Sequence, residues 1–134
     1  VQLHPFVASA AMRFDGRLAR MPAYRARAAA LAECLAGIDG LSVVPAPPQV
    51  NLFHLHFRAP AEALTAARDR IAAEDGAWLA PRFSVERGTG RASAEIYAGE
   101  SLLAIPRSDD RGLLAPLYAR MLALARAGAV AEAQ

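Results

Sequence analysis

Prolines and glycines divide the chain into short segments, and this division limits the folds that the chain can form. The cluster Pro45-Ala46-Pro47-Pro48 cannot lie inside a β-ladder, because proline has no backbone N–H to donate. Pro22 and Pro60 suit the first turn of a helix, where the missing N–H costs nothing. Gly40 suits the left-handed residue that ends a helix. The segments between these residues predict a domain of several short helices and strands.

Four helices are expected, over residues 6–20, 22–38 and 60–76 and from near Asp109 or Asp110 onward. In the second helix, apolar residues three or four positions apart align on one face, which predicts packing on a core: Tyr24, Ala28, Leu31, Leu35 and Ile38. Off that face lie Arg25, Arg27 and Glu33. The third helix is expected to point Leu64, Ala67 and Ile71 inward, and the last to point Leu113, Leu117, Met121 and Leu124 inward.

Four strands are expected, over residues 41–44, 50–57, 77–85 and 92–98. In the second strand, side-chain alternation places Phe53, Leu55 and Phe57 on a core face and Leu52, His54 and His56 on a partly polar face. The turn Arg87-Gly88-Thr89-Gly90 suits a hairpin between the last two strands.

This order predicts an α+β fold, a two-layer small domain. We expect a mainly antiparallel sheet of three or four strands, covered by helices, with a helical N-terminal part over residues 6–38 and an α/β part over residues 41–128. No repeat or linker divides the chain, so residues 1–134 are expected to form a single domain. The one crossover is expected to be right-handed.

Composition excludes several classes of protein. All 15 basic residues are arginine, and Cys34 is the only cysteine, which excludes a disulfide-stapled scaffold and a zinc ribbon. The net charge is +2 with arginines interspersed, so no nucleic-acid partner is expected. No apolar run approaches the roughly 20 residues of a membrane span, and no signal-peptide pattern opens the chain, so we expect a cytoplasmic protein without a membrane partner. The chain begins at Val1 instead of methionine, which favours a fragment or a processed chain.

The side chains alone predict no self-sufficient active site. His54 and His56 share a strand face but lack a third metal ligand, so no metal is expected. Cys34 is interpreted as a buried, inert thiol, and Asp109-Asp110 as helix caps. Three arginines lie at strand ends, where each is either solvated or able to bind a carboxylate through paired hydrogen bonds: Arg82, Arg87 and Arg91.

Four segments resemble the C-terminal part of the threonine aldolase and β-eliminating lyase family: Phe6–Ala11, Arg20–Arg27, Leu31–Gly40 and Pro48–Phe53. The last is the most specific, because Pro48-Gln49-Val50-Asn51-Leu52-Phe53 is similar to the family strand Val-Gln-Thr-Asn-Met-Val. The resemblance extends from Gln2 to about Leu124. It implies a pyridoxal-phosphate enzyme of the aspartate-aminotransferase-like fold.

The resemblance also implies roles for individual residues. Schiff-base chemistry needs a lysine amine, and the chain has no lysine, so pyridoxal phosphate is expected on a domain upstream of Val1 and the chain is expected to be inactive alone. A small-domain arginine binds the substrate carboxylate in this family. Arg91 is the nearest, about two positions early, with Ser93 or Ala94 at the expected place, and Tyr97 falls near a family histidine. Gln2 and His4 are expected to line the substrate site.

The sequence therefore predicts the C-terminal domain of a pyridoxal-phosphate-dependent lyase with an amino-acid substrate. The full-length enzyme is expected to be a homo-oligomer. The alternative that the sequence leaves open is a stand-alone α+β binding or dimerisation module without catalysis. The upstream gene sequence distinguishes the two hypotheses.

Overall fold

The sheet has four strands in the order β1-β2-β4-β3, and each neighbouring pair is antiparallel. The computed structural model describes residues 4–88 and 90–132. Its elements are, in chain order, α1 (His4–Leu35), β1 (Leu41–Val44), β2 (Leu52–Phe57), α2 (Ala61–Asp75), β3 (Ser84–Val85), β4 (Ala92–Tyr97), α3 (Glu100–Ala104), the π-helical turn η1 (Asp110–Leu114) and α4 (Ala115–Glu132). The predicted α+β class, with an antiparallel sheet and a helical N-terminal part, is confirmed.

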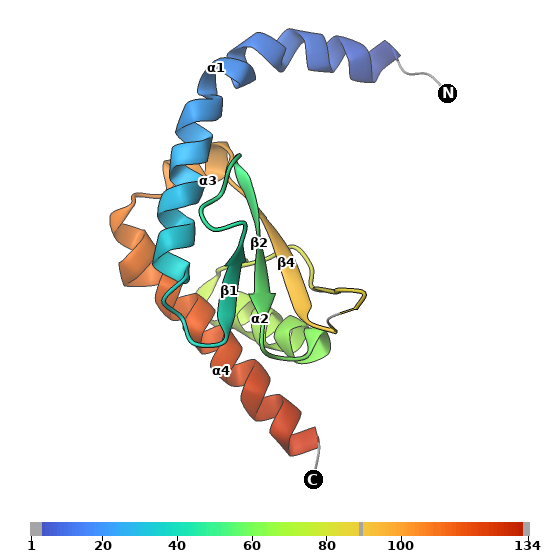
Figure 1. The fold of residues 1–134 in the computed structure, drawn as a ribbon, viewed down its shortest axis with the longest axis vertical. Coiled ribbons are helices and arrows are strands. Elements are labelled where there is room, and N and C mark those ends of the chain that lie inside the picture. The colour runs from blue at the N-terminus through green and yellow to red at the C-terminus, as the bar shows by residue number, and fades with distance from the viewer. Residues whose placement is uncertain (1–3, 89, 133–134) are drawn as a thin grey trace.

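One face of the sheet carries the core. The register pairs Phe53 with Ile96, Leu55 with Ala94 and Phe57 with Ala92, so their side chains point to the same side. In Figure 1 the strands lie in front of α2 and α4, and the second half of α1 runs beside the sheet. The largest fully buried side chains come from these elements: Leu35, Phe53, Leu55, Phe57, Leu64, Ile71, Met121 and Leu122. The predicted inner faces of β2 and α2 are confirmed.

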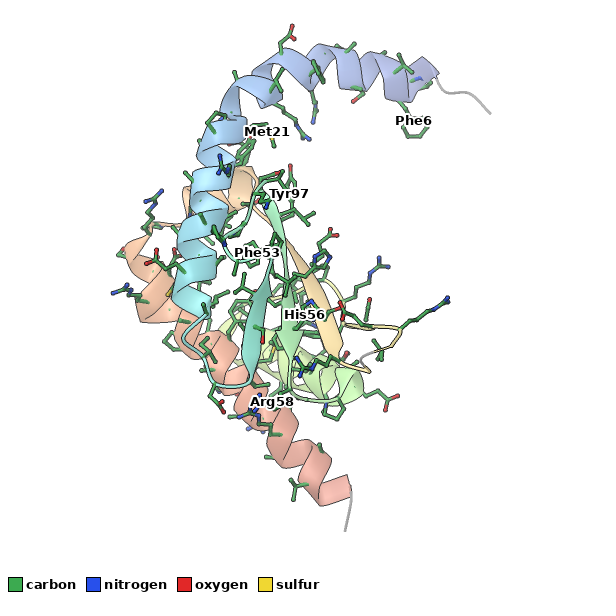
Figure 2. All side chains as sticks on the ribbon, in the orientation of Figure 1. Phe6, Met21, Phe53, His56, Arg58 and Tyr97 are labelled. Atoms are coloured by element: carbon green, nitrogen blue, oxygen red, sulfur yellow. The ribbon has the colours of Figure 1, made fainter. Side chains whose placement is uncertain are left out.

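One helix, α1 (His4–Leu35), replaces the two helices predicted over residues 6–20 and 22–38, because α1 continues through Pro22. A proline inside a helix removes one backbone hydrogen bond and displaces the carbonyl four residues earlier, which kinks the helix without stopping it. Figure 1 shows α1 changing direction, and Figure 2 places Met21 next to this bend. The buried stripe from Tyr24 to Leu35 is confirmed, but the helix ends at Leu35, before the predicted Ile38. Gly40 is left-handed, as predicted, with φ +81°, but it lies five residues beyond the end of the helix and so is not its cap.

The strand predicted over residues 77–85 is mostly wrong, because only Ser84–Val85 pairs with β4. In the loop before β3, the backbone carbonyls accept hydrogen bonds from side chains instead of from a neighbouring strand. Arg68 Nη1 donates to the oxygens of Ala80 at 3.3 Å and Pro81 at 2.9 Å, and the Tyr118 hydroxyl donates to that of Leu79 at 2.5 Å. The predicted hairpin between β3 and β4 is confirmed, with Gly88 and Gly90 at positive φ, while Thr89 lies outside the described residues.

The final helix begins as predicted, but with a π-helical turn over Asp110–Leu114. Within such a wider turn the angle between successive side chains differs from that of an α-helix, and Leu113 lies inside it. Leu113 is therefore 51% exposed instead of inward, whereas Leu117 and Met121 are buried as predicted. The short helix α3 before this turn was not predicted.

Asp110 does not cap this helix, and Asp109 makes no side-chain capping bond. Instead Asp110 pairs with Arg27, which was predicted to lie off the buried face of its helix. Their side chains are 5% and 3% exposed, and the guanidinium and carboxylate join at 2.5 and 2.6 Å. The interpretations of Arg27 as lying off the buried face and of Asp110 as a helix cap are therefore both wrong. A charged side chain can be buried when an oppositely charged partner accepts or donates its hydrogen bonds.

One helix in the described part of the chain, Asp110–Val130, has the length and apolar composition of a membrane span, with a mean hydropathy of 1.3. Core helices of globular proteins have the same composition. Leu117, Met121 and Leu122 of this helix are buried in the domain core, and Arg120 forms ion pairs with Glu74 and Asp75 of α2. These contacts are those of a core helix.

Replacing Tyr118 with phenylalanine is expected to lower the free energy of unfolding by about 1 to 3 kcal/mol, because the buried Leu79 carbonyl loses its donor. Burial raises the pKa of Tyr118, so the folded state holds the phenolic proton more tightly than the unfolded state does. This stabilisation is present below the pKa of an unfolded tyrosine, about 10, and is lost as the pH rises above it.

Urea unfolding at neutral pH and above pH 10 measures both effects. The expected outcome is a less stable Tyr118→Phe protein whose stability falls less steeply at alkaline pH. Tyr97→Phe is the matched control, because Tyr97 is 55% exposed, and we expect a change within about 0.5 kcal/mol. If the free energy of unfolding falls equally at alkaline pH in the Tyr118→Phe protein and the parent, ionisation of Tyr118 is not the cause of that fall.

Candidate functional site

The polar groups of the domain gather on the outer sheet face, the side of the sheet opposite the core. Strand register places His54 opposite Glu95 and His56 opposite Ser93, and Ser84 of β3 pairs with Ser93. The His54 Nε2 to Glu95 Oε2 distance is 3.8 Å, and the His56 Nε2 to Glu86 Oε1 distance is 3.3 Å. The predicted partly polar face of β2 thus carries two histidine–carboxylate contacts.

A cavity of about 590 Å³ opens on this face. Its lining combines one cation, two carboxylates, an imidazole and two hydroxyls: His54, Pro81, Arg82, Ser84, Glu86, Ser93 and Glu95. A guanidinium beside serine hydroxyls can bind a carboxylate, and a carboxylate side chain can accept from an ammonium group. The cavity therefore has the donors and acceptors that a zwitterionic ligand requires.

The structure brings one of the predicted substrate residues to this face. Arg91 directly precedes β4 and is exposed, and alternation along the strand puts it on the same side as Ser93, two residues later. Ser93 itself is buried and lines the cavity, whereas Ala94 points into the core. Tyr97, at the other end of β4, is exposed.

A second predicted substrate residue, His4, lies on an element away from the outer sheet face. His4 begins α1, and Figure 1 shows that end of the helix far from the β3–β4 hairpin. Gln2 lies outside the described residues. Arg87 is exposed in the hairpin turn.

The histidines and the cysteine make no reactive cluster in the described residues. His54 and His56 contact different glutamates, and no group of three metal-binding side chains is found there. Cys34, predicted to be a buried and inert thiol, is only half-buried. It lies toward the C-terminal end of α1, on the helix face beside the core.

The sequence analysis did not identify the two glutamates that line the cavity. Glu86 and Glu95 were not identified, because their contacts with His56 and His54 join residues 30 and 41 positions apart, which no local pattern predicts. Arg82 was identified, but only as one of three equivalent arginines. Alternation within β4 was the available signal for Glu95, since it shares a side with Ser93.

The strand motif at Asn51 also has a physical role. Asn51 is 7% exposed, and its Nδ2 donates to the Ala98 carbonyl at 3.1 Å. The Ala98 N–H donates in turn to the Asn51 carbonyl at 2.7 Å. This reciprocal pair extends the contact between β2 and β4 beyond their ladder and fixes where β4 ends.

Comparison with solved structures finds a likeness to the family that the strand motif resembles. No protein-family profile and no curated protein sequence matches the chain significantly. A solved structure of a Listeria monocytogenes EGD-E protein assigned as an L-allo-threonine aldolase superposes on 90% of the chain with a TM-score of 0.74 and 27% identity. The predicted family resemblance is confirmed.

A second solved structure supports the threonine aldolase and lyase likeness. It is an Exiguobacterium sp. 255-15 protein assigned as an aromatic amino acid β-eliminating lyase/threonine aldolase, and it superposes on 91% of the chain with a TM-score of 0.72 and 26% identity. The chain spans 33% of the length of each solved protein. The chain thus has the fold of the C-terminal region of this family.

Proposed function

We propose that residues 1–134 form the single C-terminal domain of a pyridoxal-phosphate-dependent lyase that resembles threonine aldolase, and that the outer sheet face forms one wall of its amino-acid substrate cleft. The observation that carries this proposal is the superposition of about nine tenths of the chain on one third of two solved proteins of that kind. A cytoplasmic homo-oligomer without nucleic-acid or membrane partners belongs to the same proposal.

The chain does not fit pyridoxal phosphate by itself. Schiff-base attachment needs a lysine ε-amine, and none of the 134 residues is a lysine. The cofactor would therefore be held by another part of the full-length protein, and the chain alone is expected to be inactive. The role left to the described residues is binding and orienting the substrate.

Charged and polar side chains on the outer sheet face can bind and orient the substrate. Arg82 lies in the cavity wall with Ser84 and Ser93, where an incoming carboxylate can accept hydrogen bonds. Glu86 and Glu95, in the same wall, disfavour a second anion and can accept from cationic donors. Arg91 lies beside this cavity on the same face, so two arginines are candidates for the carboxylate contact.

The test is to express the complete reading frame that contains the chain, alongside residues 1–134, and to measure pyridoxal-phosphate binding and retro-aldol cleavage of L-allo-threonine. We expect binding and cleavage by the complete protein and neither by residues 1–134. A complete protein that binds no pyridoxal phosphate would contradict the proposal. A reading frame confined to this chain would favour the stand-alone module.

Arg82→Gln in the complete enzyme is expected to raise KM for the amino acid by about 10- to 100-fold, the equivalent of a lost charge-assisted hydrogen bond of about 1.5 to 3 kcal/mol. Arg91→Gln tests the sequence-based candidate in the same assay. Arg87→Gln is the matched control, because Arg87 is exposed in the hairpin turn.

Steady-state kinetics and thermal unfolding of each variant separate binding from folding, and unchanged KM in both Arg82→Gln and Arg91→Gln would exclude this carboxylate contact.

A further inference from the structure

The N-terminal half of α1 exposes a large apolar surface. Residues 5–20 are exposed throughout, including five large apolar side chains: Phe6 at 74%, Val7 at 64%, Met12 at 87%, Phe14 at 62% and Leu18 at 56%. An isolated helix of this length is only marginally stable in water, since most helical stability in proteins comes from packing of an apolar face. This half of α1 therefore needs a covering partner.

The exposed apolar side chains continue the buried face of the same helix. Phe6, Ala10, Phe14 and Met21 follow one another four or seven positions apart, and the stripe runs on in steps of three and four positions into the buried Tyr24 and Ala28. The N-terminal members line a groove of about 560 Å³, here called the α1 groove: Phe6, Ser9, Ala10, Arg13, Phe14, Arg17, Leu18 and Met21. Figure 2 shows Phe6 and Met21 on the inner side of the helix bend. One apolar stripe thus has a covered half and an uncovered half.

The charges of the α1 groove restrict its occupant. Arg13 and Arg17 both line the groove, and neither has an ion pair among residues 4–88 and 90–132. Arg20 pairs with Glu100 of α3. If a second copy covered the groove about a two-fold axis, the two central arginines would face their counterparts, and like charges across an interface are strongly unfavourable. The occupant should instead carry carboxylates around an apolar surface.

We propose that the α1 groove docks on the remaining part of the full-length protein, the polypeptide that corresponds to the two thirds of the matched solved chains without a counterpart here. This inference rests on the proposed function and adds the surface that joins the two parts. The solved proteins carry this domain fold within chains about three times as long, so a covering polypeptide of the same chain is available. Its docking surface is apolar and edged by carboxylates that receive Arg13 and Arg17.

Thiol protection tests the proposal. In a Cys34→Ala background, Phe14→Cys places a thiol in the α1 groove, and Met12→Cys places the matched control thiol almost opposite on the same helix. Alkylation rates are measured in residues 1–134 and in the complete protein. The thiol at position 14 is expected to react at least about tenfold more slowly in the complete protein, because interface cores exclude solvent, while the thiol at position 12 changes less. Hydrogen exchange of residues 5–20 in the unsubstituted protein is the second measurement.

Equal reactivity at position 14 in both proteins, together with unprotected amides over residues 5–20, would overturn the proposal. Protection in residues 1–134 alone that grows with concentration would also overturn it, because it would identify a second copy as the occupant. Pyridoxal-phosphate binding is scored separately. A complete protein that binds the cofactor without protecting position 14 refutes the docking surface alone, whereas protection without cofactor binding refutes the proposed function alone.

Discussion

Replacing Arg27 with alanine is expected to lower the free energy of unfolding by about 3 to 5 kcal/mol, because the change leaves the Asp110 carboxylate buried without its partner. Both oxygens of Asp110 accept from Arg27, at 2.5 and 2.6 Å. Arg27 Nε also donates to the Leu102 carbonyl at 3.0 Å. Arg27 thus connects α1 to α3 and to the π-helical turn, and its replacement removes all three of these hydrogen bonds at once.

Urea unfolding of Arg27→Ala and Asp110→Ala measures this effect. The double variant Arg27→Met with Asp110→Leu is expected to be more stable than either single variant, because it removes both charges and keeps apolar volume. Arg25→Ala is the matched control, since Arg25 is exposed two residues away on the same helix, and its expected change is within about 0.5 kcal/mol. Single variants as stable as the control would show that the pair contributes nothing.

This ion pair shows why part of the fold was not predictable from the sequence. Arg27 and Asp110 lie 83 positions apart; helical periodicity placed Arg27 off the buried face, and Asp110 was interpreted as a helix cap. Periodicity measures hydrophobic side chains, so it cannot identify a buried charge that is satisfied by another buried charge. The π-helical turn at Asp110 also changes the side-chain spacing, which explains the wrong orientation of Leu113.

Local sequence patterns predicted the structure correctly where burial against the core is the main constraint on a segment. Alternation in β2 correctly separated Phe53, Leu55 and Phe57 from His54 and His56, because each side of that strand has one environment. Pro22 was interpreted as a helix start on local grounds alone. The structure retains a kinked helix there, since the residues after Pro22 are held by packing of the stripe from Tyr24 to Leu35.

The candidate site was predictable only in part, for a related reason. The family resemblance led us to expect a carboxylate-binding arginine near the last strand, with Arg91 as the nearest candidate. Arg91 lies on the same side of the sheet as Ser93, which lines the cavity, and its role stays a prediction. Arg82 lines the cavity from the loop before β3. Side chains from α2 and α4 hold that loop, and such long-range contacts leave no local sequence pattern.

Arg68→Met is the variant expected to disturb this loop most. Arg68 is 7% exposed, donates to the Ala80 and Pro81 carbonyls, and lies over the Trp78 ring with 4.1 Å between Cζ and the ring centroid. Hydrogen bonds to a charged group contribute about 1.5 to 3 kcal/mol and a cation–π contact about 0.5 to 1 kcal/mol, so we expect a loss of about 3 kcal/mol.

Trp78 is the only tryptophan, so its fluorescence reports directly on the loop. In Arg68→Met the emission is expected to change before global unfolding, because the ring loses its cationic neighbour and the backbone beside it loses two donors. Arg70→Met is the matched control, since Arg70 is exposed on the same helix and its one ion pair within the described residues is with Glu74, one turn away. The decisive comparison is between urea unfolding followed by fluorescence and by circular dichroism. Coincident transitions with unchanged native emission in Arg68→Met would mean that Tyr118 alone holds the loop, and the Arg82 side of the cavity would then be independent of Arg68.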